Sequence, residues 1–319
     1  MHALVFERFG GPEVLQWREV PDPIPEPMQV LVRTKAIGLN FADIYRRQGN
    51  YHLKGDPPWI AGYEAAGEVV SAPPDCGLNP GDRVAFADSP HANAELVVVD
   101  LDRIIRLPDA IDFETAAAVL LQGLTADYLI HDSHPLIAGE TILVHAAAGG
   151  VGQLLVQMAN AKGAQVIGLV SSESKRQIAL ASGAATVLLT GSDWLSELQS
   201  LYPRGVDVVF DSTGSTLDAS LDAVRIGGRV VFYGMAGGDP APVEPRVLMD
   251  GSKTLTGGDL WNVLTSAAER QARASKLFNL ISNGALKVQI DSRYPLADGA
   301  GAHARLESRL AMGKILLIP

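Results

Sequence analysis

The clearest chemical signal in the sequence is a glycine-rich segment, Thr141-Ile-Leu-Val-His-Ala-Ala-Ala-Gly-Gly-Val-Gly152. In it Ala147, Gly149 and Gly152 hold the three positions of a G-x-G-x-x-G dinucleotide-binding turn. A small first residue permits a tight turn, Gly149 leaves the backbone open to a pyrophosphate, and Gly152 allows close packing of a helix on a strand. Amides at the start of a helix over 153–162 would then face the phosphates. We therefore expect a dinucleotide site here; the alternative is a glycine-rich turn that binds nothing.

The end of the next strand, expected over 165–170, indicates which dinucleotide is bound. A site for NADH usually offers an acidic residue to the ribose hydroxyls about 20 residues past the glycines. Here the strand runs into Ser172, Lys175 and Arg176, which suit a 2′-phosphate as hydroxyl and cationic donors. NADPH is therefore predicted over NADH. Glu173 is the alternative, because a strand that ends one or two residues later would make it the ribose-binding acid.

Several other polar residues are expected to have structural rather than catalytic roles. The segment His131-Asp-Ser-His134 could suggest a metal, but no third ligand is evident and a polar connector is expected. A single cysteine, Cys76, excludes a disulfide framework and a zinc site built from several thiolates. We expect His145 to be a packed strand residue rather than a base, and Asp211 to cap a turn rather than line the cofactor site.

The composition favours a folded enzyme. At about 150 residues per domain, 319 residues indicate two domains. Hydrophobic residues make up 47% and charged residues 19% of the chain, which excludes dominant disorder. The net charge of −10, without a basic tract, argues against nucleic acid or an anionic membrane as partner. No secretory signal or membrane span is apparent, so a cytoplasmic protein is expected.

The hydrophobic pattern divides the chain into two kinds of structure. The first third is mainly β, with valine-rich strands predicted over 30–36, 65–72, 83–87 and 94–99 and a proline-rich connecting loop over 20–27. From 113 the period changes to a helical pair over 113–130. Helices and strands then alternate, as in a doubly wound parallel sheet, with strands over 141–146, 165–170, 186–189, 206–210, 229–233 and 253–256. A helix over 267–283 and a last strand over 314–318 follow.

The chain resembles the zinc-free quinone oxidoreductases of the medium-chain dehydrogenase/reductase superfamily along nearly its whole length. The segments that carry the resemblance are GLNFAD (38–43), RQGNY (47–51), GYEAAG (62–67), GDRV (81–84), GLTADY (123–128), HAAAGGVG (145–152), DSTG (211–214), YPL (294–296) and GKILLIP (313–319).

The resemblance implies an α/β protein with two domains. A GroES-like, mainly β catalytic domain would cover 1–125 and be completed by 258–319, and a Rossmann NADP(H)-binding domain would cover 126–257. It also implies a homodimer, for which the edge strand near 253–256 is the candidate interface. Carried over position by position, the resemblance implies that Asn40 and Tyr45 lie beside the nicotinamide and that further cofactor contacts come from Thr125, Tyr128, Gly149, Gly150, Val151, Ser172, Lys175 and Lys314.

Zinc-dependent relatives place a cysteine at the position of Asn40 and a histidine at that of Tyr63, so a metal-free site is implied. Such an enzyme would transfer hydride from NADPH to quinones, with Tyr45 and Asn40 as hydrogen-bond donors and Tyr51 and Tyr63 as weaker candidates. The alternative is an NADPH-dependent reductase of conjugated carbon–carbon double bonds in enones, alkenals or enoyl thioesters. A third possibility is a non-catalytic protein that binds the cofactor in a structural or sensing role.

Overall fold

The computed structural model describes residues 1–53 and 55–319, which form two compact units. Unit 1 consists of Met1–Leu124 and Leu264–Pro319, and unit 2 of Thr125–Val263. The second division falls after Val263 rather than after 257. Past the last strand the chain stays with unit 2 at Gly258, because the Gly258 amide donates to the Phe232 carbonyl and a Cβ there would lie 2.8 Å from the Tyr128 hydroxyl.

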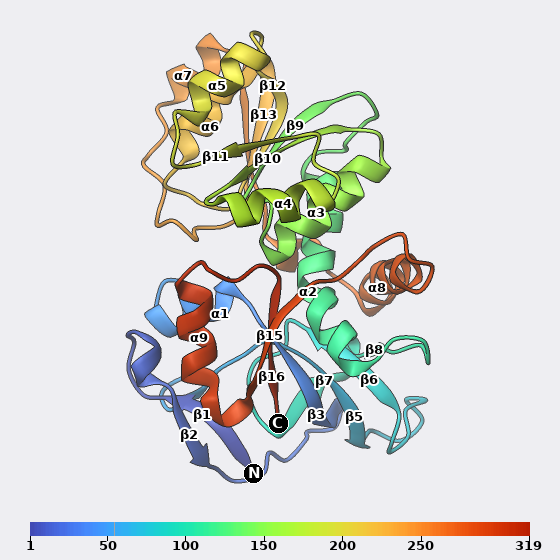
Figure 1. Ribbon diagram of the computed structural model, residues 1–319. Coiled ribbons are helices and arrows are strands. Elements are labelled where there is room, and N and C mark those ends of the chain that lie inside the picture. The colour runs from blue at the N-terminus through green and yellow to red at the C-terminus, as the bar shows by residue number, and fades with distance from the viewer. Residues whose placement is uncertain (54) are drawn as a thin grey trace. The chain divides into compact units, whose positions relative to one another are not determined.

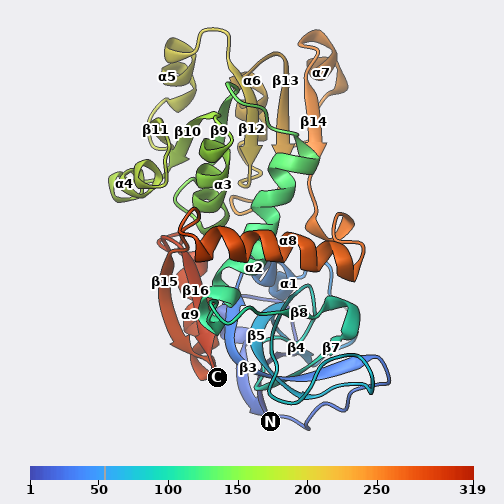
Figure 2. The same ribbon diagram turned by 90° about the vertical axis from the view of Figure 1, so that its right-hand side faces the viewer.

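Unit 2 is a doubly wound parallel sheet. Its strands are β9 (Thr141–His145), β10 (Gln165–Val170), β11 (Thr186–Leu189), β12 (Val206–Asp211), β13 (Val224–Phe232) and β14 (Thr254–Gly257). Figure 2 shows them side by side in the order β11-β10-β9-β12-β13-β14. Numbered along the chain, this is the order 3-2-1-4-5-6 of dinucleotide-binding domains, which places the end of β9 at the topological switch point.

The helices of unit 2 pack around this sheet (Figure 1). They are α3 (Gly150–Ala161), α4 (Glu173–Ala181), α5 (Trp194–Leu201), α6 (Leu217–Ala223) and α7 (Pro245–Asp250). Because helices cover the sheet, the central strand β9 is apolar on both faces, and Ile142, Leu143 and Val144 are all buried. The expected alternation of strands and helices is confirmed.

Unit 1 is built on a seven-stranded sheet in the order β15-β16-β3-β5-β6-β8, with β7 also paired to β3. The bounds are β3 (Gln29–Leu39), β5 (Glu64–Ser71), β6 (Arg83–Ala87), β7 (Leu96–Asp100), β8 (Ile105–Arg106), β15 (Ile290–Pro295) and β16 (Lys314–Ile318). A smaller sheet contains β1 (His2–Phe6), β2 (Gln16–Glu19) and β4 (Trp59–Ile60). The helices are α1 (Phe41–Gln48), α8 (Ala267–Ser282) and α9 (Gly299–Glu307).

The last strand, β16, completes this sheet from the far end of the sequence. It pairs antiparallel with β3, so that Ile315 lies opposite Leu39 and Leu316 opposite Gly38 (Figure 1). This register brings Lys314 to the end of β3, where α1 begins. The expectation that the C-terminal residues belong with the N-terminal third is therefore met by direct strand pairing.

One prediction was wrong in the connection between the units. Instead of a helical pair over 113–130, the structure has one helix, α2 (Phe113–Tyr128), that continues in a π-helical turn, Leu129–Ser133. The run 116–120 is buried without exception. In a helix that is apolar on all sides, the apolar residues do not follow a single face. Their spacing in the sequence therefore cannot distinguish one long helix from two short ones.

The other departures are small. The proline-rich segment 20–27 contains no helix or strand, as expected, whereas α3 begins at Gly150 rather than at 153, because the glycines themselves form its first turn. Among the helices of the described residues, none combines the length and apolar character needed to cross a membrane.

Candidate active site

The polar centre of unit 1 is Asn40, which joins β3 to α1. Its backbone is extended (φ −132°, ψ 157°), as at a helix N-cap. The backbone amide of Asn40 donates to Asp43 Oδ2 at 2.9 Å, so the first turn of α1 fixes the backbone of Asn40. Both residues are buried.

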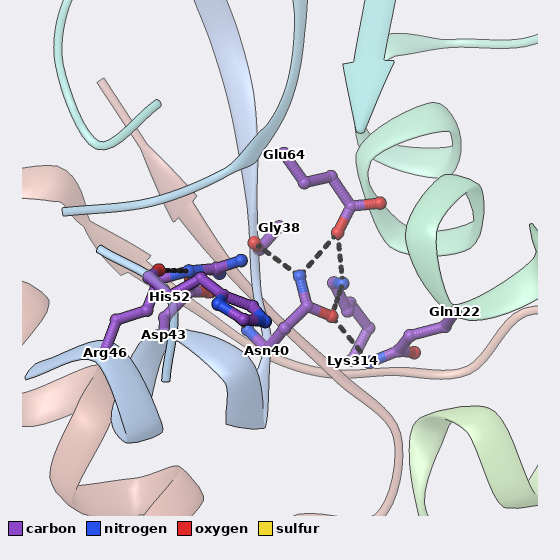
Figure 3. A network of polar contacts seen from close by, with 8 residues as sticks. All are labelled: Gly38, Asn40, Asp43, Arg46, His52, Glu64, Gln122 and Lys314. Carbon is purple, nitrogen blue, oxygen red and sulfur yellow. Dashed lines mark hydrogen bonds and ion pairs between the residues drawn. The ribbon is translucent and has the colours of Figure 1, made fainter. Parts of the chain in front are cut away.

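The side chain of Asn40 lies between two pairs of partners (Figure 3). Its Nδ2 donates to the Gly38 carbonyl at 3.2 Å and to Glu64 Oε2 at 2.8 Å. Its Oδ1 accepts from Lys314 Nζ at 2.8 Å and from Gln122 Nε2 at 3.4 Å. Both hydrogens of the Asn40 side-chain amide therefore form hydrogen bonds within unit 1.

A buried ion pair supports this arrangement. Lys314 Nζ lies 2.6 Å from Glu64 Oε2, and the exposed fractions of the two side chains are 1% and 0%. The second Glu64 oxygen accepts from the Leu121 amide at 2.6 Å. Gly38 is required beside it, since a Cβ there would lie 2.4 Å from Glu64 Oε2. Such a pair is tolerated only when both charges keep hydrogen bonds, and here both do.

A second ion pair lies on the backbone side of Asn40. Arg46 Nη1 is 3.5 Å from Asp43 Oδ1, and Arg46 Nε donates to the His52 carbonyl at 3.0 Å. The guanidinium stacks on the Tyr63 ring at 3.4 Å from its centroid. Burial raises the pKa of Asp43 to about 6, against the opposing effects of Arg46 and of the Asn40 amide.

The aromatic candidates lie on or near the same helix. Tyr45 is half-buried on α1, with ring centroids 6.2 Å from Phe41 and 6.3 Å from Tyr51. Tyr51 is half-buried, whereas Tyr63 is buried beneath Arg46. The proposed donor role of these hydroxyls stays a prediction.

In unit 2 the glycine-rich segment forms the predicted turn between β9 and α3. Gly149 is the N-cap of α3 and has no side chain that could accept a hydrogen bond. The backbone amides of the first turn, at Gly150 and Val151, are therefore not capped by the N-cap residue and can donate to a bound anion. A Cβ at Gly152 would lie 2.2 Å from the Ala146 carbonyl oxygen, which shows how closely the helix approaches the strand. The geometry fits a pyrophosphate on the helix N-terminus.

The end of β10 carries hydroxyls and a cation. The strand ends at Val170, and Ser172 is the N-cap of α4, accepting from the Lys175 amide. Lys175 Nζ donates to Ser171 Oγ at 3.2 Å. Glu173 is already in the helix and pairs with Arg176 at 2.9 Å. The acid is therefore past the strand tip, and the residues at the tip fit a 2′-phosphate.

The two remaining cofactor candidates lie at the end of α2. Thr125 and Tyr128 are buried in unit 2, and the Tyr128 side chain is only 2% exposed, beside Gly258. Lys314, for its part, has its ammonium on Glu64 and Asn40 in unit 1. Cofactor contacts by these three residues stay predictions.

The residues His145 and Asp211, on the adjacent strands β9 and β12, belong to a closed network. Asp211 Oδ1 accepts from the amides of Thr213 and Gly214, which confirms the turn cap. Asp211 Oδ2 accepts from Ser220 Oγ at 2.7 Å, and the same hydroxyl lies 3.1 Å from His145 Nε2. Burial lowers the pKa of His145. Burial alone would raise the pKa of Asp211, but His145 and these hydrogen bonds together hold it below its usual value.

The two histidines of the segment 131–134 each contact a different acidic residue. His131 lies against Asp127 and His134 Nε2 lies 3.0 Å from Glu140, so each is paired separately. Residues 1–53 and 55–319 contain no group of three or more histidine, cysteine or acidic side chains placed to hold a metal ion.

Sequence models of two families match the chain. One, described as the alcohol dehydrogenase GroES-like domain, matches residues 26–138, and the other, described as zinc-binding dehydrogenase, matches residues 150–276. A quinone oxidoreductase of Pseudomonas aeruginosa is 41% identical over 320 residues, covering 98% of both chains. The chain belongs to the quinone oxidoreductase family of the medium-chain dehydrogenases and reductases.

Further relatives of this oxidoreductase extend the comparison. A 2-haloacrylate reductase of a Burkholderia species is 35% identical over 328 residues, covering 99% of this chain and 98% of the relative. The crystal structure of Escherichia coli quinone oxidoreductase complexed with NADPH superposes with a TM-score of 0.96 at 37% identity, covering both chains completely. The predicted family and the fold of two domains, GroES-like and Rossmann, are confirmed.

Sequence reasoning missed three residues of the unit 1 site. Glu64 enters the sequence analysis only as part of the segment GYEAAG, and Gln122 and Arg46 are not singled out there. A buried-strand segment that contains a glutamate, as GYEAAG does, was a usable signal for Glu64, because a carboxylate in such a place needs a cation. No local pattern marks Gln122, which reaches the site through tertiary packing alone.

Proposed function

We propose that this enzyme is an NADPH-dependent, metal-free reductase of quinones. The observation that carries the proposal is the occupation of the metal-ligand positions of zinc-dependent relatives by Asn40, which is fully hydrogen-bonded, and by Tyr63, which packs under Arg46. Quinones accept a hydride without a Lewis acid, so this chemistry needs no metal. The bound reduced nicotinamide supplies that hydride.

The chain's own residues supply binding and orientation. Gly149, Gly150 and Val151 would hold the pyrophosphate, and Ser172 with Lys175 would hold the 2′-phosphate through charge-assisted hydrogen bonds. The NADPH complex of the Escherichia coli relative supports this choice of cofactor. In unit 1 the rigid group around Asn40 would form the wall on which the acceptor rests, with Tyr45 beside it.

A second candidate is the reduction of conjugated carbon–carbon double bonds. The 2-haloacrylate reductase, whose name describes such a substrate class, is similar over 99% of this chain and therefore favours it. The cofactor and the acceptor wall would be the same; only the hydride acceptor would change from a quinone to an activated alkene.

The deciding experiment follows cofactor oxidation by absorbance with NADPH and NADH against a benzoquinone, a naphthoquinone and a short enone, with and without a chelator. Fast NADPH oxidation on quinones, insensitive to chelator, is expected. Activity on the enone alone would move the assignment to the second candidate. Tight NADPH binding without oxidation on any acceptor would indicate a non-catalytic role, and stoichiometric zinc in the purified protein would contradict the metal-free proposal.

Replacing Lys175 by Ala tests the cofactor choice. The lost charge-assisted contact is worth about 1.5–3 kcal/mol, so NADPH should bind roughly 10- to 100-fold more weakly while NADH changes little. Fluorescence titration of both cofactors measures this. Lys162, which follows the last residue of α3, offers a matched Lys→Ala control that should affect neither. Equal losses for NADPH and NADH would show that the 2′-phosphate lies elsewhere.

We also propose that two copies associate through β14, which forms one edge of the unit 2 sheet. An edge strand presents unpaired backbone groups that a second copy can satisfy. Sedimentation equilibrium should give twice the chain mass, and a monomer at micromolar concentration would remove the proposal.

A further inference from the structure

We propose that the carboxamide of Gln122 donates the hydrogen bond that polarises the acceptor's carbonyl oxygen, and that the buried Lys314–Glu64 pair fixes which end of that carboxamide faces outward. The inference rests on the proposed function and names the residue that touches the substrate. It assigns Asn40 to positioning rather than to donation.

Both side-chain donors of Asn40 are already in use. A side-chain amide carries two N–H donors on one nitrogen. At Asn40 these lie on the Gly38 carbonyl and on Glu64 Oε2, at 3.2 and 2.8 Å. No N–H of Asn40 remains for a substrate.

The orientation of the Asn40 side-chain amide is set by its charged partners. Its oxygen faces the Lys314 ammonium at 2.8 Å and its nitrogen faces the Glu64 carboxylate at 2.8 Å. A flipped amide would direct N–H groups at a cation and oxygen at an anion, at two positions that are both buried. The ion pair therefore permits one orientation only.

The orientation of Asn40 in turn sets that of the Gln122 carboxamide. Because Asn40 Oδ1 is an acceptor, the atom of Gln122 that meets it at 3.4 Å must be the donor, Nε2. One N–H of Gln122 points at Asn40, and the other has no hydrogen-bond partner among residues 1–53 and 55–319. Unlike Asn40 and Lys314, Gln122 is only half-buried. Figure 3 shows it on the side of Asn40 away from Glu64.

The position of Gln122 along α2 agrees with contact to the reacting groups. Residues three apart on a helix share a face, so Gln122 and Thr125, which the family resemblance places at the cofactor, lie on one side of α2. The shared face of this one helix is the reason for assigning the substrate contact to Gln122.

The reaction balances without an acidic side chain. Hydride from NADPH brings two electrons and one hydrogen to the acceptor, and the negative charge that develops on its oxygen is stabilised by the Gln122 N–H. A proton from water then completes the hydroquinone, or the saturated ketone when the acceptor is an enone. NADP⁺ is the other product. Gln122 itself neither gains nor loses a proton.

The test replaces Gln122 by Leu, which keeps the size of the side chain and removes its donor. We expect kcat/KM to fall about 10- to 100-fold, with a larger loss on a short enone than on benzoquinone, because the weaker electrophile depends more on polarisation. The Kd for NADPH should not change. Gln271→Leu is the matched control: Gln271 is also half-buried on a helix of unit 1, but bonds Arg106 and Ser275.

A second variant, Gln122→Glu, separates donation from packing. The introduced carboxyl group can donate only when protonated, so the ratio of its kcat/KM to that of Q122L should rise as the pH is lowered from about 8 to about 5. A ratio is measured because the buried Asp43, beside Asn40, also titrates in this range in both variants.

The outcomes are distinguishable. If none of the tested acceptors supported NADPH oxidation by the wild-type enzyme, the proposed function itself would be wrong. An active wild type whose Q122L variant keeps its kcat/KM would overturn the inference alone, as would a ratio of Q122E to Q122L that does not vary with pH. If Tyr45→Phe lost the activity that Q122L keeps, the donor would be the Tyr45 hydroxyl.

Discussion

Both units contain a buried network of charged and polar side chains, but the network of unit 1 ends on a half-buried amide, Gln122, with a second N–H outside the network, whereas the half-buried hydroxyl of Thr216 in unit 2 donates to Asp211. In unit 2, His145 and Asp211 share the hydroxyls of Ser220 and Thr216, and the carboxylate also accepts two backbone amides. The acceptor capacity of Asp211 is used inside the fold.

The unit 1 network extends from buried charges to a half-buried side chain. Lys314 and Glu64 hold Asn40 from one side and Asp43 holds its backbone from the other, while Gln122 continues the network to the half-buried surface of α2. The comparison teaches that burial and charge alone do not mark a reactive centre. A closed network stabilises the fold, whereas one with a spare donor at its edge can act on a bound molecule.

The largest effect should come from breaking the ion pair of unit 1. Replacing Lys314 by Met leaves the Glu64 carboxylate buried without its cation and should lower the free energy of unfolding by about 3–5 kcal/mol. Urea denaturation measures this. The double variant K314M/E64Q should recover part of the loss, because no isolated charge remains. An unchanged midpoint for K314M would mean that the pair contributes nothing.

The next effect concerns a buried histidine outside both networks. His303 on α9 is fully buried beside Arg47, and neither of its ring nitrogens has a hydrogen-bond partner among the described residues. Burial, with a smaller contribution from Arg47, lowers its pKa to about 3. The unfolded chain binds this proton below about pH 6.5 and the folded one does not, so stability is lost as the pH falls from 6.5 toward 3.

Replacing His303 by Leu removes that loss. At pH 4.5 the free energy of unfolding of the variant should be about 2–3 kcal/mol higher than that of the wild type. At pH 7.5 the two free energies should be nearly equal. Thermal unfolding at the two pH values compares them. A difference between variant and wild type that is the same at both pH values would contradict the assigned pKa.

The smallest effect tests the closed network. Replacing Asp211 by Asn removes a charged acceptor from several donors and should cost about 1–3 kcal/mol of stability near neutral pH. Because the pKa of Asp211 is lowered in the fold, its contribution is present above about pH 4 and lost as the pH falls through the folded value. The difference from wild type should therefore shrink in acid.

Activity per folded molecule completes the contrast. D211N should keep most of its quinone reduction, whereas Q122L should keep its stability and lose turnover. Asp218→Asn, an exposed substitution on the same helix as Ser220, is the matched control for stability. Loss of turnover in D211N at full stability would remove the distinction between the two networks.

The sequence was sufficient wherever a local pattern carried the information. The glycine-rich turn, the strand that ends before Ser172 and the alternation of unit 2 depend on residues close together in the chain. The unit 1 site does not. Its central contact joins Glu64 on β5 and Lys314 on β16, and the registers of both strands on β3 bring the two side chains together. The half-buried end of the network, Gln122, lies on a helix whose neighbouring residues are uniformly apolar, so the hydrophobic pattern does not predict which way Gln122 points.

The distance between these partners along the chain also affects how the protein is made. Glu64 leaves the ribosome 250 residues before Lys314 does, and all of unit 2 is translated in between. At about 5–20 residues per second that interval lasts roughly 10 to 50 s. During that interval the Lys314 ammonium, which pairs with Glu64 in the folded protein, has not yet been synthesised, so unit 2 can fold before unit 1 is complete.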